Sequence, residues 1–251
     1  MADYLYGINP VTESLESTGR RPLELLLLDG PRQPRLARLE KLALARQVPV
    51  RWLSRDELDR LAGHARHQGV ALRLEPFCYT DLETLLQLWR SSGRNALFLL
   101  LDGITDPHNF GALLRSAEAA GCHGVIVARD RACPVTPVVE KAAAGALAHL
   151  PLCQVTNLSR TLEVLKEAGV WCYGLAGDGP AEALFATDLN RSLALVVGSE
   201  GKGLRPNIRS HCDLLLALPM RGRMTSLNAS VAAGIALYEV VRQTQAGTLA
   251  H

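Results

Sequence analysis

Short, continuous apolar runs recur along the chain from residue 96 onward. These runs are Leu97–Leu101, Gly124–Ala128, Leu152–Val155, Trp171–Leu175, Leu193–Val197 and Leu214–Leu218. Each run has the length of a β-strand, and segments with helical periodicity lie between most of them, at 111–120, 137–148 and 158–168. Because runs that are apolar throughout are typical of strands covered on both faces, we expect an α/β fold with a mostly parallel, doubly wound sheet. Such sheets bind ligands beyond the carboxyl ends of their strands, so the loops there are the candidate sites.

The first seventy-odd residues have a pattern of their own, in which shorter strands and helices alternate. Candidate strands are Leu23–Leu28, Val48–Leu53 and Val70–Leu74, and candidate helices span 10–17, 35–46 and 55–62. The alternation predicts a compact α/β domain over residues 1–75. Residues 76–95 contain Pro76 and a turn-rich end, which favours an interdomain linker with one amphipathic helix and places a second domain at 96–251.

Composition excludes several classes of protein. A formal charge of +2 is only mildly basic, so any site for a polyanion must be local. The six cysteines are scattered without a C-x-x-C pair, which favours reduced, buried thiols and no metal site. The N-terminus has no basic leader followed by an apolar core, and no apolar run approaches the roughly 18 residues of a spanning helix, so we expect a cytoplasmic protein without a membrane partner.

The first candidate loop is Asp102–Gly111, between the run Leu97–Leu101 and a helix that carries Arg115. Asn109 can cap this helix by accepting hydrogen bonds from its first amides, and Arg115 can simply face solvent. Capping and solvation therefore explain this loop, taken alone, as well as chemistry does.

The second candidate loop, Gly198–Gly203, follows the run Leu193–Val197 and is rich in glycine. Glycine lets the backbone approach a ligand closely, but it also permits a plain tight turn. The loop lacks both the Lys-Ser/Thr pair of a phosphate loop and the G-x-G-x-x-G spacing, which disfavours a nucleotide hydrolase.

The third candidate loop, Leu218–Ser230, opens a final helix that runs to about residue 243. Ser226 or Asn228 could cap that helix. Its predicted apolar face comprises Val231, Ile235, Leu237, Tyr238 and Val241. Capping does not explain why Pro219, two arginines and a Ser-Leu-Asn-x-Ser run occur together in this loop.

In their order and spacing, the three loops resemble the three sequence motifs of the SpoU family of RNA ribose 2′-O-methyltransferases. The first motif is present as Asp106–Arg115 and the second as Val197–Gly201. The third is present as Leu218–Met220 together with Ser226–Asn228. The resemblance rests on the joint spacing of the motifs, because each loop alone has a structural explanation.

The N-terminal segment extends the resemblance over nearly the whole chain. Tyr6–Val11 and His67–Val70 are similar to the ribosomal-protein-L30e-like substrate-binding domain found in the branch of the family that modifies 23S rRNA. The resemblance thus implies a small L30e-like α/β domain followed by a knotted Rossmann-like methyltransferase domain. Its C-terminal trefoil knot would be an exception to the general rule that chains are not knotted.

The resemblance also implies a cofactor, S-adenosyl-L-methionine, held without a metal. The family motifs and the loop after Trp171–Leu175 would form its pocket. The implied cofactor-binding residues are Gly198, Leu218, Leu227, Leu175, Ala176 and Gly177.

Methyl transfer from a sulfonium to an alcohol requires alignment of sulfur, methyl and oxygen, and help for the hydroxyl to lose its proton. The resemblance implies Arg115 for the second task, with Asn109, Glu200, Ser226 and Asn228 holding Arg115 and the ribose. Because a guanidinium normally stays protonated, two versions are open. Either strongly perturbed surroundings deprotonate Arg115, or it stays cationic and stabilises the developing alkoxide while gripping a phosphate.

RNA binding requires positive charge near the pocket. Candidate phosphate contacts are Lys202, Arg205, Arg209, Arg221 and Arg223, of which Arg221 and Arg223 could instead be solvated loop charges. In the N-terminal domain His67 and Gln68 are candidate RNA contacts by resemblance, but they can equally form a structural turn that leads into a strand.

The resemblance implies methylation of a guanosine ribose in the peptidyl-transferase region of 23S rRNA, and a homodimer with the C-terminal helix near its interface. One alternative is a tRNA substrate, although tRNA-modifying relatives usually lack the L30e-like leader. Another is a non-catalytic, ribosome-associated RNA-binding protein of the same fold. The joint presence of Asn109, Arg115, Glu200, Ser226 and Asn228 argues against the second alternative.

Overall fold

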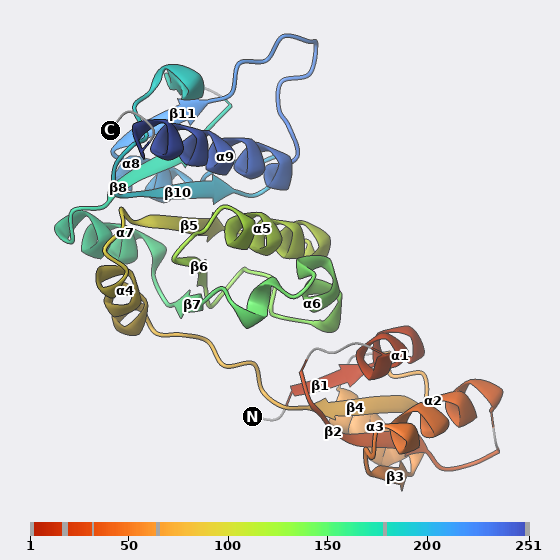
Figure 1. Ribbon diagram of the computed structural model, residues 1–251. Helices are drawn as coiled ribbons and strands as arrows, with labels where there is room; N and C mark the ends of the chain where they lie inside the picture. Colours follow the sequence, from red (N-terminus) through yellow and green to blue (C-terminus); the bar gives the residue numbers. More distant parts are fainter. Residues whose placement is uncertain (1–2, 17–19, 32, 64–65, 178–179, 249–251) are drawn as a thin grey trace. The chain divides into compact units, whose positions relative to one another are not determined.

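The chain folds into two compact units, residues 1–78 and 79–251. The structure is a computed structural model that describes residues 3–16, 20–31, 33–63, 66–177 and 180–248 (Figure 1). Each unit has its own sheet and its own hydrophobic core.

The first unit is a four-stranded sheet covered by helices. Its elements are β1 (Asp3–Tyr6), α1 (Ile8–Glu16), β2 (Pro22–Leu28), α2 (Pro34–Ala45), β3 (Val50–Leu53), α3 (Arg55–Ala62) and β4 (Val70–Leu74). The strand order is β1-β4-β2-β3, with β4 antiparallel to both of its neighbours and β2 parallel to β3. Side chains such as Leu15, Leu27 and Leu39 bury α1 and α2 on one face, and Leu58 buries α3 on the other. The predicted α/β layering of this region is therefore confirmed.

The second unit is a seven-stranded sheet between two layers of helices. Its strands are β5 (Leu97–Asp102), β6 (Gly124–Ala128), β7 (Leu152–Val155), β8 (Trp171–Leu175), β9 (Glu182–Ala183), β10 (Leu193–Gly198) and β11 (Leu214–Ala217). Its α-helices are α4 (Leu82–Ser91), α5 (Pro107–Ala119), α6 (Pro137–Ala143), α7 (Leu158–Glu167), α8 (Pro206–His211) and α9 (Ala229–Thr248), with short 3₁₀ helices at Ala146–Ala148 and Leu184–Ala186.

The strand order of this sheet is β7-β6-β5-β10-β8-β11-β9, and neighbouring strands pair in parallel throughout. The six apolar runs of the sequence each supply one strand, and their residues are mostly buried, as expected for strands covered on both faces. The predicted parallel α/β sheet is therefore confirmed. The strand order does not itself establish a chain passage through a loop, so the knot stays a prediction.

Helices cover both faces of this sheet. On one face α5 contacts both α6 and α9, and α9 also contacts β10. Gly111 permits the first of these contacts, because a Cβ at this position would collide with Ala142 of α6. On the other face α4, α7 and α8 share a core with alternate residues of β5, β6 and β10. Leu85 and Leu86 of α4 are buried there, so part of the segment expected to be a linker packs with the second unit.

Helix α9 has two different faces. The face toward the sheet and α5 is made mainly of small residues, including Ala233 and Ala236, whose size lets the helix approach closely. The opposite face exposes Val231, Ile235 and Tyr238. The single apolar face predicted from the sequence combined residues from both sides, and in this respect the prediction is wrong.

The chain has six free cysteines, four of them buried: Cys122, Cys133, Cys153 and Cys172. Burial raises the pKa of the Cys172 and Cys212 thiols to about 12, so they stay protonated near neutral pH. Within the described residues, no helix is both long and apolar enough to cross a membrane.

Candidate active site at the carboxyl edge of the parallel sheet

The candidate loops meet because their strands are neighbours. Strands β5, β10, β8 and β11 lie side by side and run in one direction, so the segments after them emerge at one edge of the sheet. These are the loop into α5, the segment that begins with Ala176, the glycine-rich loop after Gly198, and the long loop between β11 and α9 (Figure 1). Sequence positions more than a hundred residues apart are thereby brought together.

Three predicted site residues form one hydrogen-bonded cluster, which we call the Asn–Glu–Asn cluster: Asn109, Glu200 and Asn228. Asn109 donates through Nδ2 to Glu200 Oε1 at 2.9 Å. Asn228 donates through Nδ2 to the same Oε1 and to Asn109 Oδ1, the latter at 2.9 Å. Each of the three motif-bearing loops contributes one member, so the cluster fixes the loops relative to one another.

The N-caps of α5 and α9 explain why these side chains point toward one another. Asp106 caps α5 by accepting from the Asn109 backbone at 2.8 Å, so Asn109 is not the cap and the predicted capping role is wrong. Because Asp106 satisfies that amide, the Asn109 side chain can extend toward the next loop. Asn228 does cap α9, with Oδ1 accepting from the Ser230 and Val231 amides, while its Nδ2 serves the cluster.

Ser230 is a member of this arrangement that the sequence analysis noted in the third loop but assigned no role in the site. Its hydroxyl donates to Asn228 Oδ1 at 2.6 Å and lies 3.4 Å from Asn109 Oδ1. Its position could have indicated this role, because it lies two residues after the capping Asn228, in the first turn of α9. Ser226, which was singled out, is exposed and makes no hydrogen bond with the described part of the chain.

An ion pair holds the glycine-rich loop against the end of β5. Asp102, at the end of β5, is almost fully buried and accepts from Arg205 Nε at 2.6 Å and from the Arg205 backbone amide at 2.9 Å. Arg205, predicted as an RNA contact, therefore uses its Nε to hold the loop after β10 against the end of β5. Any phosphate contact would have to come from its terminal nitrogens.

The fold of the same loop requires a glycine at position 198. A Cβ at this position would collide with the backbone of Gly203 and Leu204, and Gly203 N donates to Ser199 O at 2.8 Å. The loop thus folds tightly back over the end of β10. This close packing accounts for Gly198 whether or not a ligand lies nearby.

The remaining candidate cofactor residues line the edge between β8 and β11. The Ala176 amide donates to Leu216 O at 2.9 Å, which ties the segment after β8 to β11. A Cβ on Gly177 would lie 3.4 Å from Thr225 O, so the long loop before α9 passes close to this glycine. That loop exposes three apolar side chains: Met220, Met224 and Leu227. Leu175 and Leu218 are half-buried at the ends of their strands.

Arg115 stands apart from the Asn–Glu–Asn cluster. It is exposed on α5 and makes no hydrogen bond or ion pair within the described part of the chain. At 100° per residue its side chain leaves α5 about 120° away from that of Asn109. Lys202, Arg221 and Arg223 are likewise exposed and unpaired among the described residues, whereas Arg209 is half-buried in α8.

The two candidate RNA contacts of the first unit have structural partners. His67 accepts from the Gly69 amide through Nδ1 at 3.1 Å, and its Nε2 lies 2.8 Å from Asp59 Oδ1. Gln68 Oε1 accepts from the Ile8 amide at 3.0 Å. These bonds form the turn that leads into β4. Within the described residues there is no group of histidine, cysteine or carboxylate side chains that could hold a metal.

Two protein-family models match the chain. Residues 96–238 match the SpoU rRNA Methylase family, and residues 4–80 match a domain described as RNA 2′-O ribose methyltransferase substrate binding. The 23S rRNA (guanosine-2′-O-)-methyltransferase RlmB of Xanthomonas campestris is 43% identical over 243 residues, which cover 96% of each chain.

Solved structures give the same family. The SpoU methyltransferase AviRb from Streptomyces viridochromogenes, in complex with the cofactor AdoMet, has a TM-score of 0.63 and 27% identity, covering 98% of this chain and 91% of that one. The TrmH/SpoU tRNA modifying enzyme of A. aeolicus has a TM-score of 0.57 and 26% identity, covering 66% of this chain and 85% of that one. The chain described here belongs to the SpoU rRNA methylase family.

Proposed function

We propose that this protein transfers a methyl group from S-adenosyl-L-methionine to the ribose 2′-hydroxyl of a guanosine in 23S rRNA. The observation that carries the proposal is the Asn–Glu–Asn cluster, which joins one side chain from each family motif at the carboxyl edge of the sheet. A chain that had lost catalysis would have no need to keep these three side chains in mutual contact.

The choice of RNA rests on the extent of similarity. RlmB, whose name specifies a guanosine of 23S rRNA, aligns with this chain over 96% of its length, including the first unit. The tRNA modifying enzyme of A. aeolicus aligns with only 66% of it. We therefore assign substrate recognition to the first unit and catalysis to the second, and favour ribosomal RNA over tRNA. A 23S rRNA substrate places the reaction in the cytoplasm, where ribosomes assemble.

The residues at the β8–β11 edge fit S-adenosyl-L-methionine. Gly177 leaves room beside the loop before α9, and that loop offers apolar side chains and backbone groups of the kind that suit an adenine ring and its polar edge. We assign the contacts to Leu175, Ala176, Gly177, Leu218 and Leu227. When bound, the cofactor supplies the methyl group from its sulfonium sulfur.

The side chains of the protein have the task of orienting the ribose and managing its proton. Both hydrogen bonds to Glu200 in the Asn–Glu–Asn cluster go to its Oε1. Its Oε2 accepts no hydrogen bond from the described residues, and we assign it the role of accepting from the 2′-hydroxyl. Arg115 is exposed and has no partner among the described residues, and we assign it the cationic role of stabilising the developing alkoxide and contacting a neighbouring phosphate. Ser226 lies two residues before Asn228 and is assigned a contact with the ribose.

We further propose a homodimer built on α9. Val231, Ile235 and Tyr238 expose between 36% and 52% of their surface on one side of this helix, and an apolar stripe of this kind is typical of a protein interface. Replacing Ile235 with Glu should convert a dimer to a monomer in light scattering coupled to size exclusion. A wild-type protein that elutes as a monomer at micromolar concentration would overturn this part.

The experiment that tests the function is transfer of a tritiated methyl group to total RNA from cells that lack this protein, followed by mapping of the modified ribose. Label at a single guanosine of 23S rRNA is the expected result, and label only in tRNA would overturn the assignment. A non-catalytic RNA-binding role is tested separately by calorimetry, since a protein of that kind should not bind S-adenosyl-L-methionine.

A further inference from the structure

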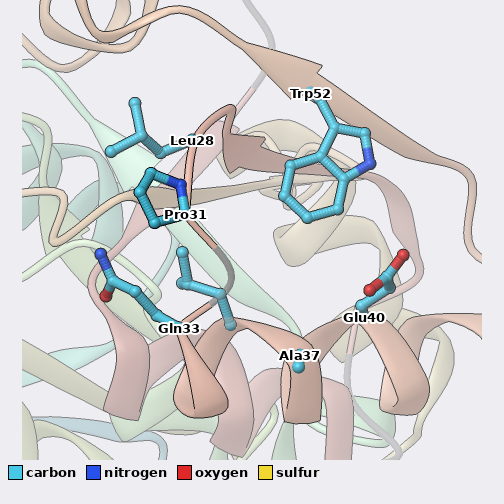
Figure 2. A pocket seen from close by; sticks show the side chains of 7 residues that line it. Leu28, Pro31, Gln33, Ala37, Glu40 and Trp52 are labelled. Atoms are coloured by element: carbon cyan, nitrogen blue, oxygen red, sulfur yellow. The ribbon is translucent and has the colours of Figure 1, made fainter.

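The first unit has a hollow of its own on the face of the sheet that α2 covers. It lies between the edge strand β3, the loop from β2 to α2 and the first turns of α2 (Figure 2). Its lining residues are Leu28, Pro31, Gln33, Leu36, Ala37, Glu40 and Trp52. The floor is apolar, and the polar side chains stand at its rim.

Trp52 forms one wall of this hollow. Its Cα pairs with Leu27 in the parallel ladder, so the side chain lies on the same face of the sheet as α2. Because β3 is an edge strand, no further strand covers the ring, and 41% of the residue surface stays exposed. An exposed indole beside a hollow offers a flat surface on which another ring can stack.

The two polar side chains at the rim have no partners in the described part of the chain. Gln33 is the N-cap residue of α2, yet its side chain makes no capping bond. Glu40, on the second turn of α2, forms neither a hydrogen bond nor an ion pair there. Figure 2 shows Glu40 on the same side of the hollow as Trp52, with Gln33 across from them. A carboxylate and an amide are therefore free to bond a ligand stacked on the indole.

The ligand that suits these groups is flat, aromatic and edged with N–H donors. An unpaired guanine base meets all three requirements, because its N1–H and N2–H groups can both donate to one carboxylate. The charges around the hollow suit a nucleic acid as well. Arg35 and Lys41 are exposed on α2, and neither forms an ion pair with the described residues, so both are available to contact phosphates of an RNA that passes along this helix.

We propose that one unpaired guanine base of the substrate RNA binds over the mouth of this hollow, stacked on the exposed face of Trp52 and hydrogen-bonded by Glu40. The inference rests on the proposed function, because it assumes that the first unit recognises RNA. It gives that unit a contact that reads a base, in addition to contacts with the phosphate backbone.

The test measures the affinity of the full-length protein for 23S rRNA transcribed in vitro, by filter binding at fixed salt and without S-adenosyl-L-methionine. Trp52→Ala should weaken binding about five- to a hundred-fold, which is the range for loss of one base–aromatic stack. Trp52→Phe retains a ring and should recover most of the loss. Leu44→Ala is the matched control, because Leu44 is exposed on the same helix but does not line the hollow.

Base identity is tested with two hairpin RNAs that share a stem and carry loops of guanosine or of adenosine. The wild type should prefer the guanosine loop, and Glu40→Gln should abolish that preference. Affinities unchanged in both Trp52→Ala and Glu40→Gln overturn the proposal. A loss of affinity that occurs only with ribosomal particles containing protein also overturns the proposal, because it would identify the occupant as a protein.

Failure of the proposed function gives a different result. If wild-type protein does not methylate rRNA, the binding measurements still report on the hollow. If it does methylate rRNA while the variants bind as tightly as wild type, only the base site is disproved.

Discussion

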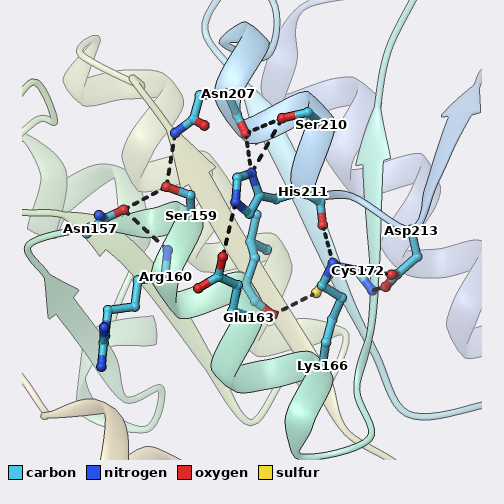
Figure 3. A network of polar contacts seen from close by, with 11 residues as sticks. Asn157, Ser159, Arg160, Glu163, Lys166, Cys172, Asn207, Ser210, His211 and Asp213 are labelled. Carbon is cyan, nitrogen blue, oxygen red and sulfur yellow. Dashed lines mark hydrogen bonds and ion pairs between the residues drawn. The ribbon is translucent and has the colours of Figure 1, made fainter.

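The second unit holds two polar clusters that differ in how completely the chain satisfies them. The α7–α8 network comprises Glu163, Lys166, Cys172, His211 and Asp213 (Figure 3). His211 Nε2 lies 3.3 Å from Glu163 Oε1, and Lys166 Nζ donates to His211 O at 3.0 Å. Asp213 lies 3.6 Å from Lys166 and accepts from the Cys172 amide at 2.8 Å. Each charged group here has a partner of its own.

The Asn–Glu–Asn cluster is bonded within itself, and the loops and the helix that supply it also carry cations without partners among the described residues. Arg115, Lys202, Arg221 and Arg223 are exposed without partners among the described residues. Buried or half-buried polar groups normally find partners within the protein, so a satisfied network indicates a structural role. Exposed, unpaired cations on the same loops and helix that supply an ordered cluster at the strand ends instead indicate a surface that a polyanionic substrate completes. The two clusters should therefore respond differently to mutation.

The largest effect should come from Arg115. Arg115→Ala should lower the single-turnover rate of methyl transfer about 10²- to 10³-fold, as for loss of one group that stabilises charge in a transition state. The melting temperature should not change, because Arg115 has no partner to lose among the residues that the structure describes. Rates are measured with enzyme in excess over 23S rRNA.

Arg115→Lys sharpens this prediction. A lysine keeps the charge but loses the planar fork, so it should restore part of the rate if Arg115 acts as a cation. A rate unchanged from wild type in both variants would remove Arg115 from the mechanism.

Two capping asparagines allow the clusters to be compared directly. Asn228 caps α9 at the site, and Asn157 caps α7, where its side chain accepts from the Arg160 amide. Replacing either with Ala should cost about 1 kcal/mol of unfolding free energy in urea titrations, the usual value of an N-cap. Only Asn228→Ala should also lower the methylation rate, because its Nδ2 holds Asn109 and Glu200. Equal losses of rate in the two variants would show that the effect at Asn228 is one of stability.

Much of the fold followed from local pattern. The apolar runs predicted the strands of the second unit because burial on both faces leaves a continuous apolar signal. The resemblance implied a single site of five residues, namely Asn109, Arg115, Glu200, Ser226 and Asn228. The structure joins three of them in one hydrogen-bonded cluster. Arg115 and Ser226 make no hydrogen bond to that cluster, and the catalytic roles of all five stay predictions. The sequence pattern did not predict that α9 has a buried face of small residues and a separate exposed apolar face. Apolar residues alone do not reveal which side of a helix packs against the protein.

The partners of individual side chains were the harder part of the site. Nothing local distinguishes Asp106 from Asn109 as the cap of α5, since either residue type can cap a helix. In the sequence, Arg205 cannot be distinguished from other arginines near a basic loop. The fold shows that its Nε is bound to the buried Asp102. Contacts between loops that are distant in sequence depend on strand order, which periodicity does not encode.

A smaller effect is expected from the two arginines before α9. Each phosphate contact on single-stranded RNA contributes roughly 0.7 to the slope of log affinity against log salt. Arg221→Ala combined with Arg223→Ala should therefore flatten that slope by about 1.4 if each arginine meets one phosphate. Arg160→Ala is the matched control, because Arg160 is exposed on α7 and belongs to the other cluster's surroundings. An unchanged slope in the double variant would mean that both arginines face only solvent.

The smallest effect should be on the pH dependence of stability. Burial, assisted by the charge of Arg94, lowers the pKa of His123 below its ordinary value of 6.5. The neutral ring accepts from the Leu97 amide at 3.1 Å and lies 2.9 Å from Ser92 Oγ. As the pH falls through 6.5, the unfolded chain therefore takes up a proton at His123, whereas the folded chain does not. The free energy of unfolding is consequently at its full value above this pH and declines below it. The slope cannot exceed about 1.4 kcal/mol per pH unit for one proton. His123→Gln should reduce the loss of unfolding free energy between pH 7.5 and 5.5, and equal losses in variant and wild type would exclude His123 as its source.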